Sequence, residues 1–359
     1  MRSCDAHANL ASVCPEARHL LTHETVQELA CQPWRAHIHS RLTKLATRGH
    51  NLYSHIRFNA WMPPPLHGCV FNLTQFGTGD GAKLLCGIEA EARGTATVLS
   101  LGSNGDVSFE ASILAGSGAN VDVFDCTYPR CPGPRMSGPK GTRNWPAELR
   151  TGRLRYHEIC VGPRDDLAFN AVLRSTNRST PKAFLSYPTI ASHLASSGRG
   201  RVTAVKMDIE GFEWPVFDGL LAAHARDAYA PLPSQIAFEL HYRSTSSKTL
   251  GWTKDGPSAA DIARLAIRLY DTGYRTLSKV YTNNCPHCTE ISLLRVFCPG
   301  TNGHKGSPGS RMGALPHPTV AVGELARGAP WGPADPAKGC TRTARFGWLD
   351  RRVRRWLHG

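Results

Sequence analysis

The chain has 359 residues, of which 41% are hydrophobic, enough to bury the core of one large domain or two small ones. No apolar run reaches the roughly 20 residues of a membrane-spanning helix, and the first residues lack the apolar middle of a signal peptide. We therefore expect a soluble, untargeted protein, or a chain without its true start. The net charge is +14, and half of it lies in residues 301–359, where ten Lys and Arg accompany three Asp and Glu. A nucleic-acid-binding fold more often carries its charge on the folded domain, so this distribution makes nucleic acid an unlikely partner.

The cysteine content indicates the redox environment. Twelve cysteines are many for a cytosolic chain of this size, and Cys126 and Cys131 are close in sequence. Two acceptor sequences for N-glycosylation, at Asn72 and Asn177, are compatible with a secretory lumen. We predict an oxidising compartment, such as the lumen of the endoplasmic reticulum or Golgi or the extracellular space.

The composition divides the chain into three regions. Residues 1–65 are polar and rich in histidine, with one helix expected over 23–47. After the three prolines of 62–68, strand-like and helix-like patterns alternate through the domain that we place at 80–298. Residues 301–359 are basic and rich in Gly and Pro, and we expect a disordered tail whose amphipathic end could alternatively contact a membrane surface or a partner.

Within 80–298, apolar strands and helices follow one another as in repeated β-α units. Such units, closed by a hairpin, predict an α/β sandwich with a mainly parallel sheet, that is, a three-layer Rossmann-like fold. Strands are expected at 95–101, 119–125, 153–162, 201–211, 235–242, 275–283 and 290–297, and helices after Gly105, over 187–198, from Phe212 and over 257–274.

In an open parallel sheet, ligands bind outside the carboxyl ends of the strands. The polar residues at those ends should therefore converge on one site. They are Gly102, Ser103, Asn104 and Gly105 after the first strand, Asp125 after the second, Asp208 and Glu210 after the fourth, and Glu239 and His241 in the fifth.

The turn Gly102 to Gly105 and Asp125, 20 residues after Gly105, are typical of an adenosine-binding site. The glycines let a ligand approach the backbone, and the acid can accept both ribose hydroxyls. A dinucleotide favours Gly-x-Gly-x-x-Gly, and the middle glycine is missing here. The pattern favours a cofactor without phosphates, such as S-adenosylmethionine, over a nicotinamide cofactor, and a plain tight turn is the structural alternative.

Asp208 and Glu210 are two residues apart, so they point to the same side if the strand continues. A buried unpaired carboxylate would cost several kcal/mol, so each should meet water, a cation or hydrogen-bond donors. The partner could be a cofactor sulfonium or amine, a metal, or a substrate hydroxyl. A structural role as an acid at a helix N-terminus is the alternative for Glu210 and the preferred reading for Glu213, whereas for Asp208 we favour function.

Glu239 and His241 repeat this pattern on the next strand. A histidine beside a carboxylate is a natural general base near neutral pH, although a histidine at a strand end is often only a packed structural group. His157, inside the third expected strand, is assigned to packing. Cys285 and Cys288 form a lone CxxC, which favours a disulfide or loop thiols over zinc, and we predict no metal.

Several co-linear segments together resemble one family. They are VLSLGSNGDVSFE, VDVFDCT, RLRYHEICVG, VKMDIEGFEW, QIAFELHY and CPHCTEISLLRVF, preceded by DGAKLLC at 80–86. In this order and at these spacings they resemble the eukaryotic methyltransferase-like domain family related to the FkbM-type class I methyltransferases. The resemblance covers about residues 80–298.

The resemblance implies a seven-stranded, mostly parallel sheet with one antiparallel strand near an edge, and S-adenosylmethionine as cofactor. It also implies that Gly102 to Gly105 form the cofactor loop, that Asp125 holds the ribose, and that Asp208 to Gly211 lie beside the transferable methyl group. Related FkbM-type enzymes methylate hydroxyls, often on sugars.

We therefore expect an S-adenosylmethionine-dependent methyltransferase acting on oxygen, with a small-molecule or glycan acceptor. Asp208, Glu210, Glu239 and His241 are the candidates for aligning the acceptor and removing its proton. The alternatives are a nicotinamide-dependent oxidoreductase and a non-catalytic binding protein on the same fold.

Overall fold

The structure is a computed structural model of the 359-residue chain. It describes residues 13–30, 65, 69–91, 96–126, 152–165, 169–173, 178–182, 184–226, 232–241, 259–280 and 288–298. The predicted tail at 301–359 and most of the long Pro/Gly-rich loop after Cys126 lie outside these residues.

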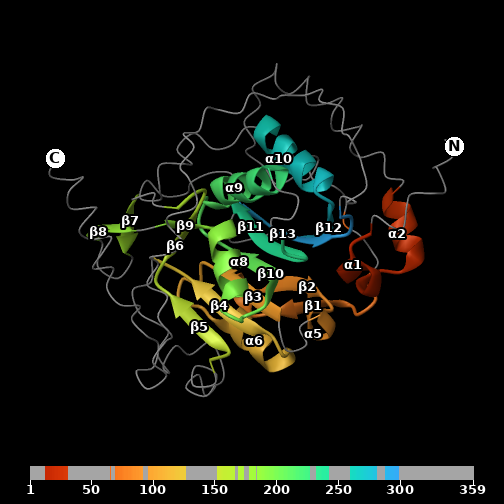
Figure 1. The fold of residues 1–359 in the computed structure, drawn as a ribbon, viewed down its shortest axis with the longest axis horizontal. Helices are drawn as coiled ribbons and strands as arrows, with labels where there is room; N and C mark the ends of the chain where they lie inside the picture. Colours follow the sequence, from red (N-terminus) through yellow and green to blue (C-terminus); the bar gives the residue numbers. More distant parts are fainter. Residues whose placement is uncertain are drawn as a thin grey trace.

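A seven-stranded sheet forms the centre of the domain (Figure 1), with the strand order β12-β13-β11-β10-β3-β4-β5. Neighbouring strands from β11 to β5 are parallel, and β13 runs antiparallel to both β11 and β12. The expected mostly parallel, Rossmann-like sheet with one antiparallel strand near an edge is thus confirmed. The strands are β3 (Ala96–Leu101), β4 (Asn120–Phe124), β5 (Leu154–His157), β10 (Arg201–Met207), β11 (Gln235–His241), β12 (Tyr274–Val280) and β13 (Cys288–Arg295).

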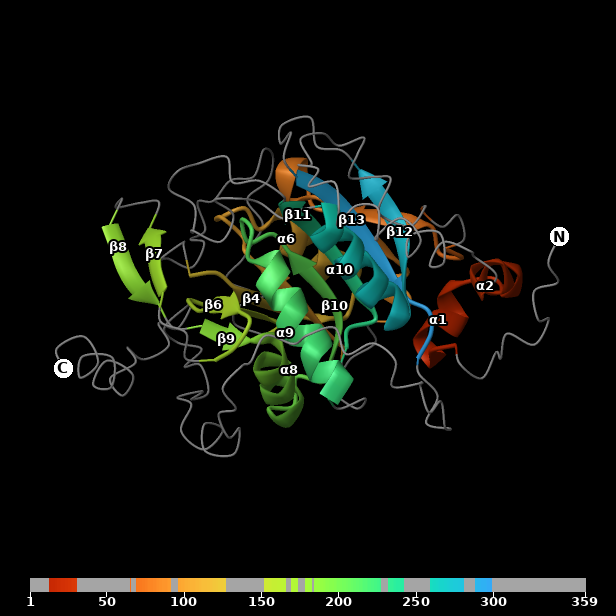
Figure 2. The ribbon, with the colours of Figure 1, turned by 90° about the horizontal axis from the view of Figure 1, so that it is seen from above.

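Both faces of the sheet are covered, which makes three layers (Figures 1 and 2). Helices α8 (Tyr187–Ser196), α9 (Glu213–Arg226) and α10 (Ala259–Asp271) cover one face. Helix α6 (Ser108–Gly116) and the hairpin β1 (Leu73–Phe76) and β2 (Lys83–Cys86) cover the other, with the 3-10 turn η2 (Gly79–Gly81) between the two hairpin strands and α5 (Ile88–Glu91) after them.

The side chains of the central strands alternate between these two cores. In β3, Leu99 and Leu101 pack under the three helices, whereas Val98 packs against α6 and the hairpin. In β11, Phe238 belongs to the helix side and Ala237 to the hairpin side. All of these side chains are fully buried, as expected for strands of a parallel sheet with both faces covered.

The strand predicted over 153–162 is wrong in its second half. Strand β5 ends at His157, and β6 (Cys160–Gly162) leaves the main sheet to pair in parallel with β9 (Phe184–Ser186). A disulfide joins Cys160 to Cys126, the residue after Asp125, and holds this segment across the end of β4. A further hairpin, β7 (Phe169–Leu173) and β8 (Arg178–Lys182), follows β6.

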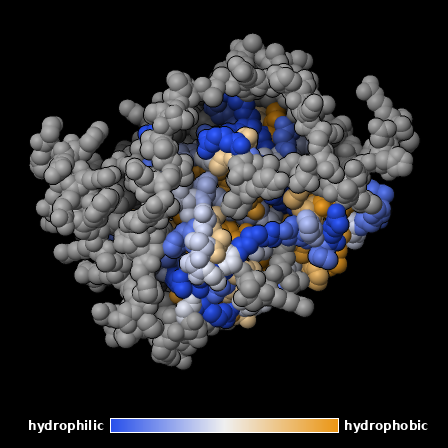
Figure 3. Space-filling view, in the orientation of Figure 1, coloured by the Kyte–Doolittle hydropathy of each residue, from blue (hydrophilic) through white to orange (hydrophobic). Residues whose placement is uncertain are grey.

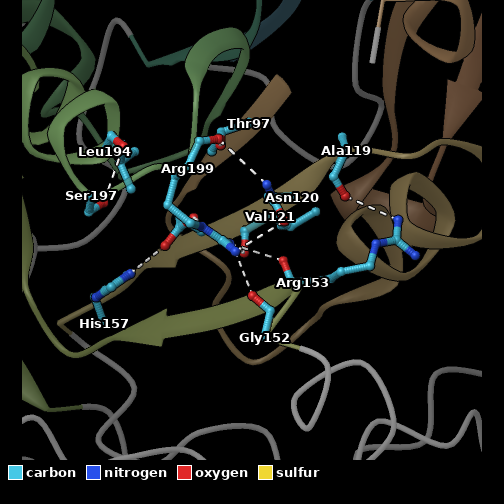
Figure 4. A network of polar contacts seen from close by, with 11 residues as sticks. Thr97, Ala119, Asn120, Val121, Gly152, Arg153, His157, Leu194, Ser197 and Arg199 are labelled. Atoms are coloured by element: carbon cyan, nitrogen blue, oxygen red, sulfur yellow. Dashed lines mark hydrogen bonds and ion pairs between the residues drawn. The ribbon is translucent and has the colours of Figure 1, made fainter. Parts of the chain in front are cut away.

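A buried ion pair joins three elements at the amino ends of the strands (Figure 4). Arg199, just before β10, donates to Asp122 Oδ2 of β4 through Nε at 2.9 Å and Nη2 at 2.7 Å. It also donates to the carbonyl oxygens of Gly152 and Arg153, which precede β5. His157 Nε2 lies 2.8 Å from the other oxygen of Asp122, in agreement with the packing role expected for this histidine.

The first described residues pack against the last strand of the sheet. Helices α1 (Pro15–Leu20) and α2 (His23–Ala30) share a hydrophobic cluster with Cys86, Leu294 and neighbouring side chains. A disulfide joins Cys14 to Cys298, and the Cys14 N–H donates to the Val296 carbonyl at 2.8 Å. Part of the predicted N-terminal extension therefore contacts the domain, and the expected helix over 23–47 is described only as far as Ala30.

Hydrophobic side chains appear around α1 on the face shown in Figure 3. Val70 and Phe71, exposed by 52% and 44%, lie close by, and the Val70 N–H donates to the carbonyl of Leu20. A second disulfide, Cys69–Cys86, ties this segment to β2. None of the helices in the described part of the chain has the length and apolarity needed to span a membrane.

Candidate active site

The glycine turn between β3 and α6 follows a path that requires its glycines. Gly102, Asn104 and Gly105 all have positive φ angles, of 78°, 49° and 80°. A Cβ atom on Gly102 would lie 1.8 Å from the carbonyl oxygen of Asp208. The turn therefore passes directly against the end of β10, and only glycine permits that approach.

Asp125 holds this turn from the end of β4. Its Oδ2 accepts hydrogen bonds from the Ser103 N–H at 2.8 Å, the Asn104 N–H at 2.8 Å and the Ser103 hydroxyl at 3.0 Å. Asp125 is only 4% exposed. The predicted cofactor loop and the predicted ribose acid thus form one hydrogen-bonded unit, and the contact with ribose stays a prediction.

This arrangement discriminates between cofactors. A dinucleotide places its pyrophosphate on the backbone N–H groups of such a turn. Here the N–H groups of Ser103 and Asn104 already donate to a carboxylate, which would also repel a phosphate group. The unit therefore fits an adenosine cofactor without phosphates, such as S-adenosylmethionine, better than a nicotinamide cofactor.

A buried lysine supports the turn from beneath. Lys206 of β10 donates through Nζ to the Gly102 carbonyl and lies near Glu110 of α6. Burial raises the pKa of Glu110, although Lys206 acts in the opposite direction, and the Ser100 hydroxyl donates to this carboxyl group. Lys206 was not singled out from the sequence because it stands within an apolar strand.

The strand predicted over 201–211 is wrong beyond Met207, so the condition for Asp208 and Glu210 to point to the same side is not met. Strand β10 ends at Met207, and Glu210 has a positive φ of 57°, so the strand alternation stops there. The Asp208 carboxylate lies toward Lys83 of β2, at 3.9 Å between Oδ2 and Nζ. Glu210 is exposed, and its carboxylate lies 3.9 Å from His241 Nε2.

Glu213 shapes the turn that carries these acids. Its fully buried carboxylate accepts the N–H groups of Ile209 and Gly211, each at 2.9 Å. This is the helix-start role that the sequence favours for Glu213. In addition, Glu213 Oε1 lies 3.2 Å from His241 Nδ1, which the sequence did not predict.

His241 carries a proton at neutral pH. Burial disfavours its charged form, but the Glu213 carboxylate outweighs burial and raises the pKa of His241 to about 10. A protonated imidazole donates hydrogen bonds and cannot accept a proton. This state disfavours the predicted role of general base at neutral pH and favours a role in holding charge and orientation.

Three acidic side chains lie in a row where the parallel strands of the sheet end, and we call them the carboxylate row. It consists of Asp208, Glu239 of β11 and Glu290 of β13. Glu239 and Glu290 are directly paired in the antiparallel register, so they share a face of the sheet. Lys83 lies over the row, with Nζ at 2.6 Å from Glu290 Oε1.

Burial sets the charges in the carboxylate row. Burial raises the pKa of Glu239, and the neighbouring Asp208 raises it further. Burial also raises the pKa of Glu290, to about 7, although Lys83 opposes this shift. For Lys83, burial favours the neutral form, but Glu290 and Asp208 outweigh burial and raise its pKa.

Lys83 and Glu290 are site residues that the sequence analysis missed. Glu290 could have been found by pairing the last strand antiparallel to 235–242, because that register places it opposite Glu239. Lys83 gave only a weak signal, as a single basic residue in the apolar segment AKLLC. Its burial depends on the β1–β2 hairpin lying over the sheet, which local sequence does not specify.

Two groups of possible metal ligands overlap this site. The ligand atoms of Asp208, Glu213 and His241 lie within 4.8 Å of one another, as do those of Glu239, His241 and Cys288. His241 and Glu213 pair with each other, and the sulfur of Cys288 is disulfide-bonded, so it is not a free thiolate ligand. These groups therefore carry no assignment of a metal, and Cys285 and His287 lie outside the described residues.

The comparisons with known proteins concern the fold alone. No protein-family model and no curated protein matches the chain. Among solved structures, it is similar to a variant of the 16S rRNA (adenine(1408)-N(1))-methyltransferase from Catenulisporales acidiphilia, with 12% identity, 63% of this chain and 100% of that chain covered and a TM-score of 0.34. It is also similar to the Methanococcus jannaschii fibrillarin pre-rRNA processing protein, with 10% identity, coverage of 63% and 84% and a TM-score of 0.31.

A third similar structure is a geranyl diphosphate methyltransferase in complex with S-adenosylmethionine, with 10% identity, coverage of 78% and 98% and a TM-score of 0.30. Structural similarity at this level of identity and TM-score does not identify a substrate for this chain. The strand order and the single antiparallel strand define a mostly parallel, three-layer Rossmann-like fold.

Proposed function

We propose that this protein is an S-adenosylmethionine-dependent methyltransferase that acts on a hydroxyl group. The observation that carries the proposal is the glycine turn bound by Asp125, which adjoins the carboxylate row through the contact between Gly102 and Asp208. A phosphate-free adenosine cofactor and an acceptor hydroxyl would meet at this junction. The sequence resemblance to the FkbM-related methyltransferases supports the same reaction.

The residues of the site would have separate tasks. Gly102 to Gly105 and Asp125 would hold the adenosine part, and S-adenosylmethionine would supply a methyl group activated by its positive sulfur. Asp208, at the end of β10, would align the acceptor oxygen, and Glu239 in its protonated form would donate a hydrogen bond to another acceptor oxygen. Such alignment in a water-poor site contributes much of the rate in transfer reactions.

The charge of the site favours a neutral acceptor. Asp208, Glu210 and Glu213 would repel phosphate groups. Among the described positive groups, Lys83 and His241 are engaged by carboxylates, and Lys206 donates to the Gly102 carbonyl. A polyhydroxylated neutral acceptor such as a sugar or glycan fits these groups, whereas a nucleic acid does not.

Binding measurements test the cofactor. By calorimetry we expect S-adenosylmethionine and S-adenosylhomocysteine to bind, and NAD to bind at least about tenfold more weakly. Equal or tighter binding of NAD would support the oxidoreductase instead. Binding of S-adenosylmethionine without formation of S-adenosylhomocysteine in the presence of cell extract would support a non-catalytic binding protein.

Substitution of Asp208 tests the position of the reaction. Asp208→Asn keeps the size of the side chain but removes the charge beside Lys83, so we expect turnover to fall by about 100-fold or more while folding is retained. The measurement is the rate of S-adenosylhomocysteine formation, with circular dichroism as the check on folding. Full activity of the variant would contradict the role of Asp208.

We also propose an oxidising compartment for the mature protein. Three disulfides are present in the described part of the chain, and Asn72 of the first glycosylation sequence is exposed. Contact of the basic tail with a membrane surface remains a proposal, because residues 301–359 lie outside the described part.

A further inference from the structure

Glu290 differs from the other members of the carboxylate row in its hydrogen bonding. Its Oε1 is held by Lys83 Nζ at 2.6 Å, whereas its buried Oε2 accepts no hydrogen bond within the described part of the chain. The side chain is 12% exposed. One oxygen is therefore fixed, and the other is a buried acceptor without a hydrogen-bond donor among the described residues.

The position of Glu290 is linked to the cofactor turn by a continuous set of contacts. Gly102 lies against the Asp208 carbonyl, the Asp208 carboxylate lies 3.9 Å from Lys83 Nζ, and Lys83 binds Glu290. Glu290 is also the direct register partner of Glu239. These contacts bring strand β13, which comes last in the chain, to the ends of β3 and β10, which come earlier.

We infer that Glu290, oriented by Lys83, is the general base that removes the proton from the acceptor hydroxyl. The inference deepens the proposed function and rests on it. In the reaction, the acceptor oxygen forms a bond to the methyl carbon while the bond between that carbon and sulfur breaks. The proton of the hydroxyl passes to Glu290 Oε2, S-adenosylhomocysteine is left, and Glu290 then releases the proton to solvent.

The groups that face Glu290 set its titration. They are Lys83 of β2, Asp208 after β10, Lys206 of β10 and Glu239 of β11. Burial raises the pKa of Glu290 to about 7 against the effect of Lys83, so a large part of the protein has this carboxylate ready at neutral pH. A base is most effective when its pKa lies near the working pH.

The first experiment measures Glu290 directly, without an acceptor. The full-length protein is labelled with glutamate carrying ¹³C at the side-chain carboxyl, and Glu290 is assigned by the signal that disappears in Glu290→Gln. We expect Glu290 to titrate near pH 7 and to titrate at higher pH in Lys83→Met, with Lys83→Arg restoring the original behaviour. S-adenosylmethionine should lower its pKa, because the positive sulfur favours the carboxylate.

The second experiment measures turnover with an equimolar mixture of the methyl glycosides of glucose, galactose and mannose as acceptors. We expect Glu290→Gln to lower kcat by about 10²- to 10⁴-fold with unchanged affinity for S-adenosylmethionine. In Lys83→Met the acidic limb of the kcat profile should move to higher pH, which a purely structural ion pair would not cause. Glu16→Gln, a substitution of an ion-paired glutamate on α1, is the matched control and should leave kcat unchanged.

The outcomes separate the two proposals. If the wild-type protein fails to bind S-adenosylmethionine, the proposed function is wrong. If it binds but does not methylate the glycosides, the proposed acceptor class is wrong, and the titration alone decides on Glu290. If wild type turns over and Glu290→Gln retains kcat, or if Glu290 shows no response to Lys83→Met or to S-adenosylmethionine, the inference about the base is overturned while the proposed function stands.

Discussion

Single residues in this site act mainly through the backbone that they fix. Asp125 binds two backbone N–H groups of the glycine turn at Gly102 to Gly105, and Glu213 binds two of the turn after β10. Each carboxylate is buried and therefore depends on these donors for compensation. Asp125, after β4, and Glu213, at the start of α9, thus each hold one turn in position.

Gly102 offers a residue-scale test of the close approach between these two turns. We expect Gly102→Ala to abolish binding of S-adenosylmethionine, because the new Cβ would meet the Asp208 carbonyl at 1.8 Å and displace one of the turns. Calorimetry measures the binding. Gly198→Ala is the matched control, since Gly198 also has a positive φ, of 74°, but no atom within 4 Å of the added Cβ. The control should lose only about 1–2 kcal/mol of stability and retain binding.

Glu213 offers a test through the pH dependence of stability. The folded-state pKa of His241, about 10, lies above its unfolded value of 6.5, so its contribution to stability is complete below pH 6.5 and is lost as the pH rises to 10. The slope contributed by this one group is at most about 1.4 kcal/mol per pH unit. In Glu213→Gln the raised pKa should fall and this loss should shrink. The measurement is urea unfolding from pH 6 to 10, and parallel curves for wild type and variant would contradict the pairing.

Among the secondary-structure elements, β4, β5 and β10 depend on one charged side chain at their amino ends. Arg199 donates hydrogen bonds to Asp122 and to the backbone before β5. No local pattern in the sequence predicts these contacts. Asp125 and Asp208 of the candidate site lie at the opposite ends of two of these strands, β4 and β10. Arg199 therefore stabilises β4 and β10, whose other ends carry Asp125 and Asp208.

Removal of Arg199 should destabilise the protein strongly. Arg199→Ala leaves the fully buried Asp122 carboxylate without its main partner, so we expect a loss of about 3–5 kcal/mol in the free energy of unfolding. Arg201→Ala is the control, because the Arg201 side chain is 51% exposed and pairs with Glu16 at the surface. That variant should lose less than about 1 kcal/mol. Similar losses in both variants, measured in urea, would show that Asp122 does not need Arg199.

The elements that sequence patterns predicted well are those with a strong local signal. The strands around Val98, Val205 and Phe238 are apolar runs bounded by turns, and their carboxyl ends meet as expected for a parallel sheet. The break after His157 was missed because the contacts of the next segment, its pairing with β9 and the Cys126–Cys160 disulfide, are long-range and are not specified by spacing.

The candidate site was predictable only in part for the same reason. Asp125 and Asp208 stand at strand ends and could be found by reading along the chain. Lys83 and Glu290 enter through contacts between elements far apart in sequence, since 207 residues separate them. The roles of all four residues in the reaction stay predictions.

At the scale of the whole molecule, the two ends of the described chain meet at β13. Val13 forms a bridge with Phe297, and the Cys14–Cys298 disulfide spans 284 residues. Helix α1 thereby packs beside the strand that carries Glu290. Residues 13–30, which precede the domain in sequence, are therefore held in place by residues 297–298 after β13.

Loss of this long-range disulfide should be costlier than loss of a short one. In the chain-entropy estimate, a loop of this length contributes about 5.6 kcal/mol, against about 3 kcal/mol for Cys69–Cys86 with its separation of 17 residues. We expect Cys14→Ser with Cys298→Ser to unfold at lower urea concentration than Cys69→Ser with Cys86→Ser. The reverse order would show that native-state packing, not loop entropy, dominates.

The Cys14–Cys298 disulfide also makes the domain a covalently closed ring. A single proteolytic cut in any connection between these two cysteines would leave both fragments attached to each other. A nicked molecule should therefore keep its full mass in electrophoresis without reductant and separate into two bands only after a thiol is added. Such nicking maps the exposed connections one at a time while the sheet and the carboxylate row stay assembled.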